Sequence, residues 1–130
     1  MKKKKRNDPE YQLQCAYFEW VRIMRKTNIK YKYAFATLNG INLPIGLAVK
    51  AKKQGMDKGI WDVPISYPNF KTNKCGAFIE FKAGKNKLTK EQIEFRDNNP
   101  YYKFVVFYDL ESAIMFTEQW FSKLGDIWHI

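Results

Sequence analysis

Histidine is almost absent from this chain, and cysteine is scarce. The single histidine, His129, is the penultimate residue, which argues against a hydrolytic centre built on histidine. The two cysteines, Cys15 and Cys75, lie far apart and lack the spacing of a metal site. We therefore expect two free thiols in a reducing compartment.

Long apolar runs are also missing. No stretch approaches the length needed to span a membrane, and the basic start is not followed by the apolar core of a signal peptide. These absences predict an intracellular, cytoplasmic protein without a membrane partner. Internal repeats and low-complexity linkers are absent too, and 130 residues are enough for one domain with a hydrophobic core.

Acidic residues are outnumbered by basic ones. The chain has 13 Asp and Glu against 23 Lys and Arg, a net charge of +10. Such an excess favours a polyanionic partner, most often nucleic acid. Residues 2–6 alone supply five positive charges. We expect residues 1–8 to form a mobile basic arm that attracts phosphate without specificity, and residues 9–130 to form a single domain.

Apolar periodicity and turn signals predict the order helix, strand, helix, strand, strand, helix, strand, helix. This order predicts an α/β fold in which helices flank a small, central mixed β-sheet. The expected helices begin after Asp8, near Pro44, after Thr89 and after Asp109. The second is expected to end before Gly55 and the last before Gly125. The expected strands cover residues 31–38, 59–65, 76–82 and 103–108, and Pro64 makes the second of them short or an edge strand.

Charged side chains interrupt two of these apolar strands. Asp62 lies in the first of these strands, and Glu80 and Lys82 lie two residues apart in the next. Glu80 and Lys82 therefore share one face of their strand, and Ile79 and Phe81 share the opposite face. Two carboxylates form a hard oxygen site for Mg²⁺, and a neighbouring lysine holds a water or stabilises phosphate charge. The alternative is a structural cross-strand ion pair.

Other polar residues allow a structural and a functional interpretation. Glu10 is either a first-turn acid that favours the helix dipole or a third acidic group near a metal. Gln92 fits a capping box with Thr89, so its side chain has a structural role available. Two groups of lysines belong either to solvated surface or to a phosphate-binding surface. These are Lys50, Lys52 and Lys53 in the second helix, and Lys85 and Lys87 in the turn at residues 83–87.

Five segments, in order and at sensible spacings, match a known family. They are Glu10-Tyr11-Gln12-Leu13-Gln14 with Phe18-Glu19-Trp20, Leu38-Asn39-Gly40, Lys52-Lys53-Gln54-Gly55 leading to Gly59-Ile60-Trp61-Asp62, Ile79-Glu80-Phe81-Lys82, and Leu88-Thr89-Lys90-Glu91-Gln92. With these segments the chain resembles the VRR-NUC domain, the virus-type replication-repair branch of the PD-(D/E)XK nuclease superfamily. The resemblance extends from about Glu10 to Trp120 and implies a restriction-endonuclease-like fold.

The resemblance also implies Mg²⁺-dependent hydrolysis of DNA phosphodiesters, with Mn²⁺ as a substitute. It makes Asp62, Glu80 and the backbone carbonyl of Phe81 metal ligands and Lys82 the catalytic lysine. Glu10 matches the family's first-helix acid, a further ligand in that case, and Gln92 matches the glutamine after the central motif. One departure is Trp61, which stands where the family usually has proline.

The stand-alone form resembles phage and bacterial members of the family. Those members tend to be homodimers that cut branched DNA such as four-way (Holliday) junctions, which places them in DNA repair and recombination. A phage protein would act in the host cytoplasm. Two alternatives remain open: a flap or nonspecific DNase of the same superfamily, and a nucleic-acid-binding module whose carboxylates only pair with lysines.

Overall fold

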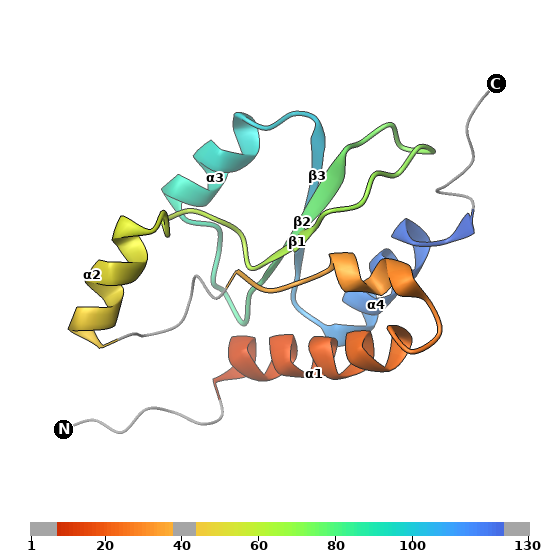
Figure 1. Ribbon diagram of the computed structural model, residues 1–130, viewed down its shortest axis with the longest axis horizontal. Helices are drawn as coiled ribbons and strands as arrows, with labels where there is room; N and C mark the ends of the chain where they lie inside the picture. Colours follow the sequence, from red (N-terminus) through yellow and green to blue (C-terminus); the bar gives the residue numbers. More distant parts are fainter. Residues whose placement is uncertain (1–7, 38–43, 124–130) are drawn as a thin grey trace.

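The computed structural model describes residues 8–37 and 44–123 and has an α/β architecture. Within these residues a three-stranded mixed sheet lies in the middle, with helices on both of its faces (Figure 1). The predicted fold class is therefore confirmed. The elements are α1 (Pro9–Met24), the 3-10 helix η1 (Ile29–Tyr33), α2 (Ile45–Lys53), β1 (Val63–Ile65), β2 (Gly76–Phe81), α3 (Lys90–Asp97), β3 (Tyr102–Phe107) and α4 (Leu110–Trp120).

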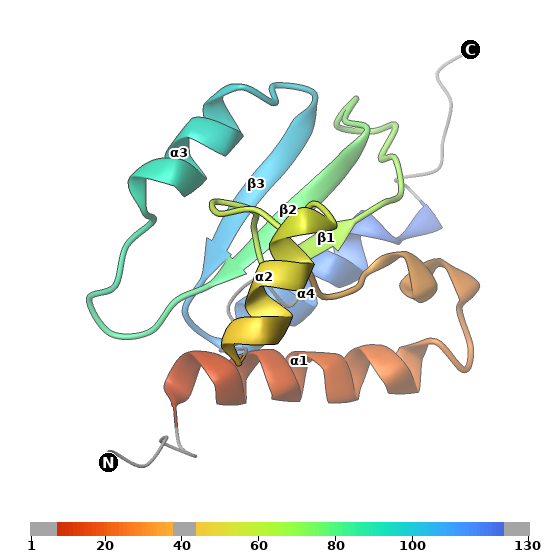
Figure 2. The same cartoon turned by 60° about the vertical axis from the view of Figure 1, so that its left-hand side comes forward.

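β2 is the central strand of the described sheet. It runs antiparallel to β1, with Val63 opposite Ile79, and parallel to β3, with Glu80 opposite Val106. Because parallel neighbours need a crossover connection, α3 lies between β2 and β3 in the chain and covers one face of the sheet (Figure 2). β1 forms an edge of the described sheet and is only three residues long, as Pro64 predicts.

The two faces of β2 pack against different helices. Phe81 contacts Tyr17 of α1, with ring centroids 5.3 Å apart, and the Tyr17 hydroxyl shares a 2.8 Å hydrogen bond with Thr117 of α4. On the opposite face, Phe78 contacts Phe95 of α3 with ring centroids 5.2 Å apart. The alternation predicted for residues 78–82 is therefore present, and Glu80 lies on the face that α3 covers.

Most of the predicted helix boundaries are confirmed. Asp8 caps α1 by accepting the Glu10 N–H at 3.0 Å, and Pro9 is the first residue of the helix. Asp109 caps α4 through the Ser112 N–H at 2.8 Å. The end predicted for α4 near residue 124 is too late, because the helix stops at Trp120.

The strand predicted at residues 31–38 is wrong in its first half. Residues 29–33 instead form η1, whose cap is Asn28; its side chain accepts the Lys30 N–H at 3.0 Å. The Arg25 guanidinium holds the end of η1 through a 2.8 Å hydrogen bond to the Ala34 carbonyl. A local cap and a cation from α1 thus outweigh the β propensity of the aromatic residues here.

Residues 33–37 do run beside β1, but the pairing is interrupted. Hydrogen bonds join the Ser66 N–H to the Tyr33 carbonyl (2.8 Å), the Phe35 N–H to the Pro64 carbonyl (3.2 Å) and the Thr37 N–H to the Asp62 carbonyl (2.9 Å). A regular antiparallel ladder would also use N–H groups of residues 64 and 62. Pro64 has none, and the Asp62 N–H binds the Glu80 side chain at 3.0 Å instead.

Several predicted features lie outside the described residues. They are the basic arm at residues 2–6, the Asn39-Gly40 turn, Leu124, Gly125 and His129. Cys15 and Cys75 are described; both are free thiols, as predicted, and both are exposed. Among the described residues, no helix combines the length and apolar character needed to cross a membrane.

Candidate active site

Asp62 and Glu80 hold each other's strands together at one end of the β1–β2 pair. The Asp62 N–H donates to Oε1 of Glu80 at 3.0 Å, and the Phe81 N–H donates to Oδ2 of Asp62 at 3.1 Å. Each carboxylate therefore uses one oxygen to accept a backbone N–H from the segment that carries the other. The structure thus brings these two carboxylates together, as predicted.

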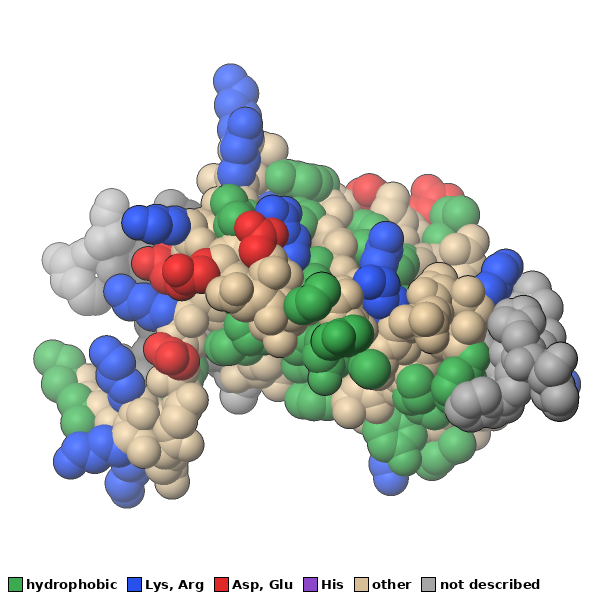
Figure 3. All heavy atoms as spheres, turned by 90° about the horizontal axis from the view of Figure 1, so that it is seen from above, with side chains coloured by type: hydrophobic (Ala, Val, Ile, Leu, Met, Phe, Trp, Pro, Cys, Tyr) green, Lys and Arg blue, Asp and Glu red, His purple; other side chains and the backbone are tan. Residues whose placement is uncertain are grey.

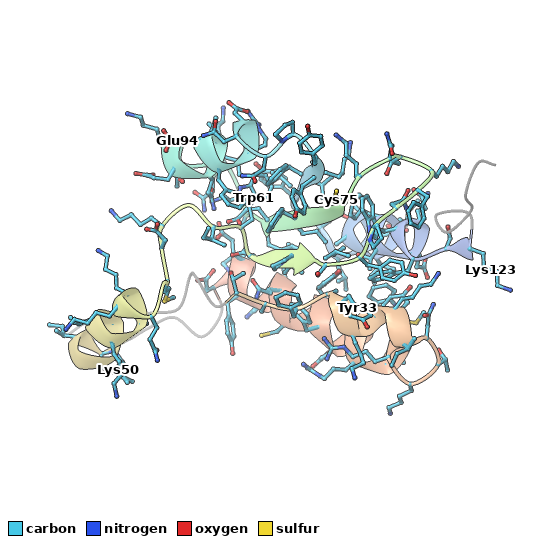
Figure 4. All side chains as sticks on the ribbon, turned by 45° about the horizontal axis from the view of Figure 1, so that its top comes forward. Tyr33, Lys50, Trp61, Cys75, Glu94 and Lys123 are labelled. Atoms are coloured by element: carbon cyan, nitrogen blue, oxygen red, sulfur yellow. The ribbon has the colours of Figure 1, made fainter. Side chains whose placement is uncertain are left out.

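Three residues around Asp62 fix its position. Gly59 has a φ of +82°, and a Cβ there would lie 2.8 Å from the backbone oxygen of Glu91, so only glycine fits. The strand predicted at residues 59–65 therefore begins only at Val63. The indole of Trp61 is 1% exposed and donates to the Gln92 carbonyl at 3.1 Å, which anchors α3 (Figure 4). The Thr37 hydroxyl donates to the Trp61 carbonyl at 3.0 Å.

Lys82 supplies the positive charge of the site. Its Nζ lies 3.5 Å from Oε2 of Glu80, the oxygen that the Asp62 N–H does not use. Both side chains are buried, with Glu80 4% and Lys82 8% exposed. The Phe81 carbonyl, the predicted third ligand, belongs to the backbone between them. An ion pair is thus present, but it joins two residues at the end of one strand and is not the cross-strand pair considered from the sequence. Burial makes such a charge pair costly to keep.

Burial and mutual repulsion alter the acidity of both carboxyl groups. Burial, followed by the charge of Asp62, raises the pKa of Glu80 from 4.5 to about 7, although hydrogen bonds and Lys82 oppose the change. Burial also raises the pKa of Asp62, against the Phe81 N–H and Lys82, and the charge of Glu10 adds to the increase. The pair therefore resists carrying two negative charges unless a further positive charge approaches.

This electrostatic strain predicts a pH dependence of stability. Glu80 ionises near pH 4.5 when unfolded and near pH 7 when folded, so the folded state binds the extra proton between these values. The free energy of unfolding should fall as pH rises from 4.5 to 7, by up to about 3 kcal/mol from Glu80. Urea unfolding of the parent and of Glu80→Gln across this range tests it, because the variant should lack this contribution. Parallel curves for the two proteins would contradict the assignment.

Gln92 has both roles considered from the sequence. Its Oε1 accepts the Thr89 N–H at 2.9 Å, and its own N–H donates to the Thr89 hydroxyl at 3.1 Å, which completes the capping box of α3. Its side chain also forms a hydrogen bond with Glu80 that lowers the pKa of that carboxyl group. Since its oxygen is the cap, the amide NH2 group is the donor to Glu80.

A matched pair of variants separates these two roles. Thr89→Ala removes the cap and leaves the Gln92 amide beside Glu80, so it should cost about 0.5–2 kcal/mol of stability with little effect on rate. Gln92→Ala should cost similar stability and also reduce the rate. Melting curves and the cleavage assay described below give both quantities. Equal rates in the two variants would leave Gln92 with the capping role alone.

Glu10 reaches the site from the first turn of α1, but its contacts are with the turn after β2. Its Oε2 accepts the Ala83 N–H at 3.2 Å and the Asn86 side-chain amide at 2.6 Å. Within residues 8–37 and 44–123, no three His, Cys, Asp or Glu residues gather closely enough to hold a metal ion by themselves. Glu10 therefore does not join Asp62 and Glu80 in a three-carboxylate cluster.

The predicted phosphate-binding lysines fall into two groups. Lys85 and Lys87 are exposed in the turn that Glu10 contacts, directly after Lys82. Lys50, Lys52 and Lys53 are exposed on α2, which stands apart from the sheet (Figures 1 and 4). Apolar side chains accompany them on this helix (Figure 3): Ile45 is 84% exposed. The structure thus brings only the first group next to the carboxylates.

The donors at this site suit Mg²⁺. This ion is usually held by one or two carboxylates, with water and substrate phosphate as its remaining ligands. Burial and mutual repulsion keep the pKa values of Asp62 and Glu80 raised despite Lys82, so the pair can accommodate a further positive charge. A two-carboxylate set therefore fits this ion without Glu10.

The mixed sheet and its flanking helices form a restriction-endonuclease-like α/β fold. A solved structure described as a VRR_NUC domain protein has a similar fold, with a TM-score of 0.67, 22% sequence identity and 93% of each chain covered. The predicted resemblance is therefore confirmed at the level of the fold. No protein-family model matches the chain, and no curated protein matches it either.

Proposed function

We propose that this protein is a Mg²⁺-dependent endonuclease that hydrolyses DNA phosphodiesters. The observation that carries the proposal is the hydrogen-bonded link between Asp62, which is half-buried, and Glu80, which is buried, at the ends of neighbouring strands. The Lys82 ammonium lies 3.5 Å from the Glu80 carboxylate. The fold shared with a VRR_NUC domain protein and the net charge of +10 support it. A purely structural ion pair between Lys82 and Glu80 would not require the second carboxylate, Asp62, which repels Glu80.

The side chains have distinct roles in this proposal. Asp62, Glu80 and the Phe81 carbonyl would hold Mg²⁺, with Mn²⁺ as a substitute. When bound, this ion supplies Lewis-acid stabilisation of the phosphate and lowers the pKa of a water molecule. Lys82 orients the attacking water and stabilises the developing negative charge with its ammonium group. Gln92 holds Glu80 in place through its amide.

The preferred substrate in this proposal is branched DNA, such as a four-way junction. The lysines on α2 and in the turn after β2 are suited to phosphate, and contacts with phosphate position a protein without reading sequence. Recognition would then depend on the shape of the DNA. We further propose a homodimer, because two symmetric sites match the two symmetric strands of a junction.

A panel of DNA substrates tests this function. Four-way junction, flap, single-stranded and linear duplex DNA are incubated with the protein and Mg²⁺, with and without EDTA. We expect cleavage that is fastest on the junction and that EDTA abolishes. Faster cleavage of flap or of every DNA would favour the alternative DNase. DNA binding without cleavage of any substrate would favour the noncatalytic module. Melting curves with added Mg²⁺ report metal binding independently of activity.

A further inference from the structure

The turn at residues 83–87 is held in place from two sides. On one side, Oε2 of Glu10 accepts both the Ala83 N–H, at 3.2 Å, and the Asn86 side-chain amide, at 2.6 Å. On the other side, the Tyr108 hydroxyl donates to the Asn86 carbonyl at 2.8 Å. Figures 1 and 2 show this segment beside the first turn of α1. Elements far apart in the chain thus converge on one short turn.

The turn presents two cations next to the carboxylate site. It begins directly after Lys82, and Lys85 and Lys87 within it are exposed. An internal hydrogen bond from the Asn86 N–H to the Ala83 carbonyl, at 3.0 Å, closes the turn. Gly84 takes a φ of +57° with open space around the position of a Cβ, so the turn faces outward. A fixed backbone reduces the entropy lost when such lysines bind a ligand.

Glu10 places a negative charge beside this turn. A carboxylate there would repel phosphate unless hydrogen-bond donors of the protein compensate its charge. Glu10 accepts two hydrogen bonds from the turn, so its charge is directed to the backbone and amide of the turn itself. Its position therefore favours holding the turn over binding a metal ion with Asp62 and Glu80.

We propose that Glu10, Asn86 and Tyr108 are positioning residues, which hold the turn at residues 83–87 so that Lys85 and Lys87 bind a backbone phosphate of the DNA strand next to the cleaved bond. This inference rests on the proposed function and specifies how that site holds its substrate. Tyr108 and Asn86 act through the turn and do not contact the reacting atoms.

Tyr108→Phe tests the proposal, because it removes only the hydroxyl group. Binding of a four-way junction is measured by fluorescence anisotropy in the Asp62→Asn background, where cleavage does not interfere. We expect about fivefold weaker binding, the effect of one lost hydrogen bond. The matched control is Tyr101→Phe. Tyr101 is exposed and directly precedes the first residue of β3, so this variant should bind DNA like the parent. In a background with Lys85→Met and Lys87→Met, Tyr108→Phe should have no further effect.

Amide hydrogen exchange without DNA gives a second measurement. Tyr108→Phe should speed exchange at residues 84–87 and leave β2 unchanged. The inference is overturned by parent-like DNA binding of Tyr108→Phe, whether or not exchange in the turn becomes faster. The inference is also overturned if Tyr108→Phe weakens DNA binding by the same factor in the background with both lysines and in the background with Lys85→Met and Lys87→Met. Failure of the Asp62→Asn protein and the parent to bind any DNA would overturn the proposed function, and this inference with it.

Discussion

Asp62→Asn and Glu80→Gln are each expected to reduce DNA cleavage by at least about a thousandfold, the upper range for loss of one charge-stabilising group. Each change removes one negative charge from the proposed Mg²⁺ site and keeps the size of the side chain. The amide oxygens still accept the Phe81 and Asp62 N–H groups, so the strand ends stay connected. Cleavage of a labelled four-way junction over time gives the rates.

Stability shows whether these variants fail for the proposed reason. At pH 8 without a divalent metal, both variants should melt at a higher temperature than the parent, because one of two repelling carboxylates is gone. Asp97→Asn is the control: it makes the same change in charge at an exposed ion pair with Arg96, and its rate should equal that of the parent. Full Mg²⁺-dependent activity in either site variant would show that the site is elsewhere.

Lys82→Met is expected to slow cleavage by about 10²–10³-fold. The change removes the ammonium group that lies 3.5 Å from Glu80 and keeps most of the buried side-chain volume. Metal binding should remain, because the carboxylates and the Phe81 carbonyl are intact. Single-turnover rates on the junction, together with the rise in melting temperature on adding Mg²⁺, separate the two effects.

Two further lysine variants make this result specific. Lys71→Met removes an exposed charge from the loop between β1 and β2, at the opposite end of this strand pair from Asp62, and should cleave like the parent. Lys82→Arg keeps a positive charge but changes its geometry, so it should remain slow. Parent rates in Lys82→Arg, together with loss of the Mg²⁺ effect in Lys82→Met, would make Lys82 a structural counter-ion.

The sequence predicted the carboxylate pair because local rules determine it. Apolar residues place Asp62 and Glu80 at neighbouring strands, and the two-residue period of a strand puts Glu80 and Lys82 on one face. The capping box at Thr89 and the caps at Asp8 and Asp109 are local patterns as well, and all three are present. The caps are visible in a sequence because they join residues two or three positions apart. The carboxylate pair needs only that two consecutive strands lie side by side.

Contacts between distant segments could not be predicted in this way. Nothing in the sequence around Thr37 indicates that its hydroxyl binds the backbone at Trp61. The sequence likewise gives no sign that Tyr108 binds Asn86. The interrupted pairing of residues 33–37 with β1 has the same cause, because it depends on how Asp62 uses its N–H group. The role of Trp61 also emerges only from its hydrogen bond to Gln92.

The two hydrogen bonds between Asp62 and the end of β2 also bear on folding fidelity. If β2 slipped by one residue against its neighbours, Glu80 would turn towards α1 and α4 and Phe81 towards α3. In that arrangement Glu80 could not accept the Asp62 N–H, and a charge would enter the apolar core. The residues proposed for catalysis therefore disfavour the misaligned register energetically. A chain with that register would also lack the proposed active site.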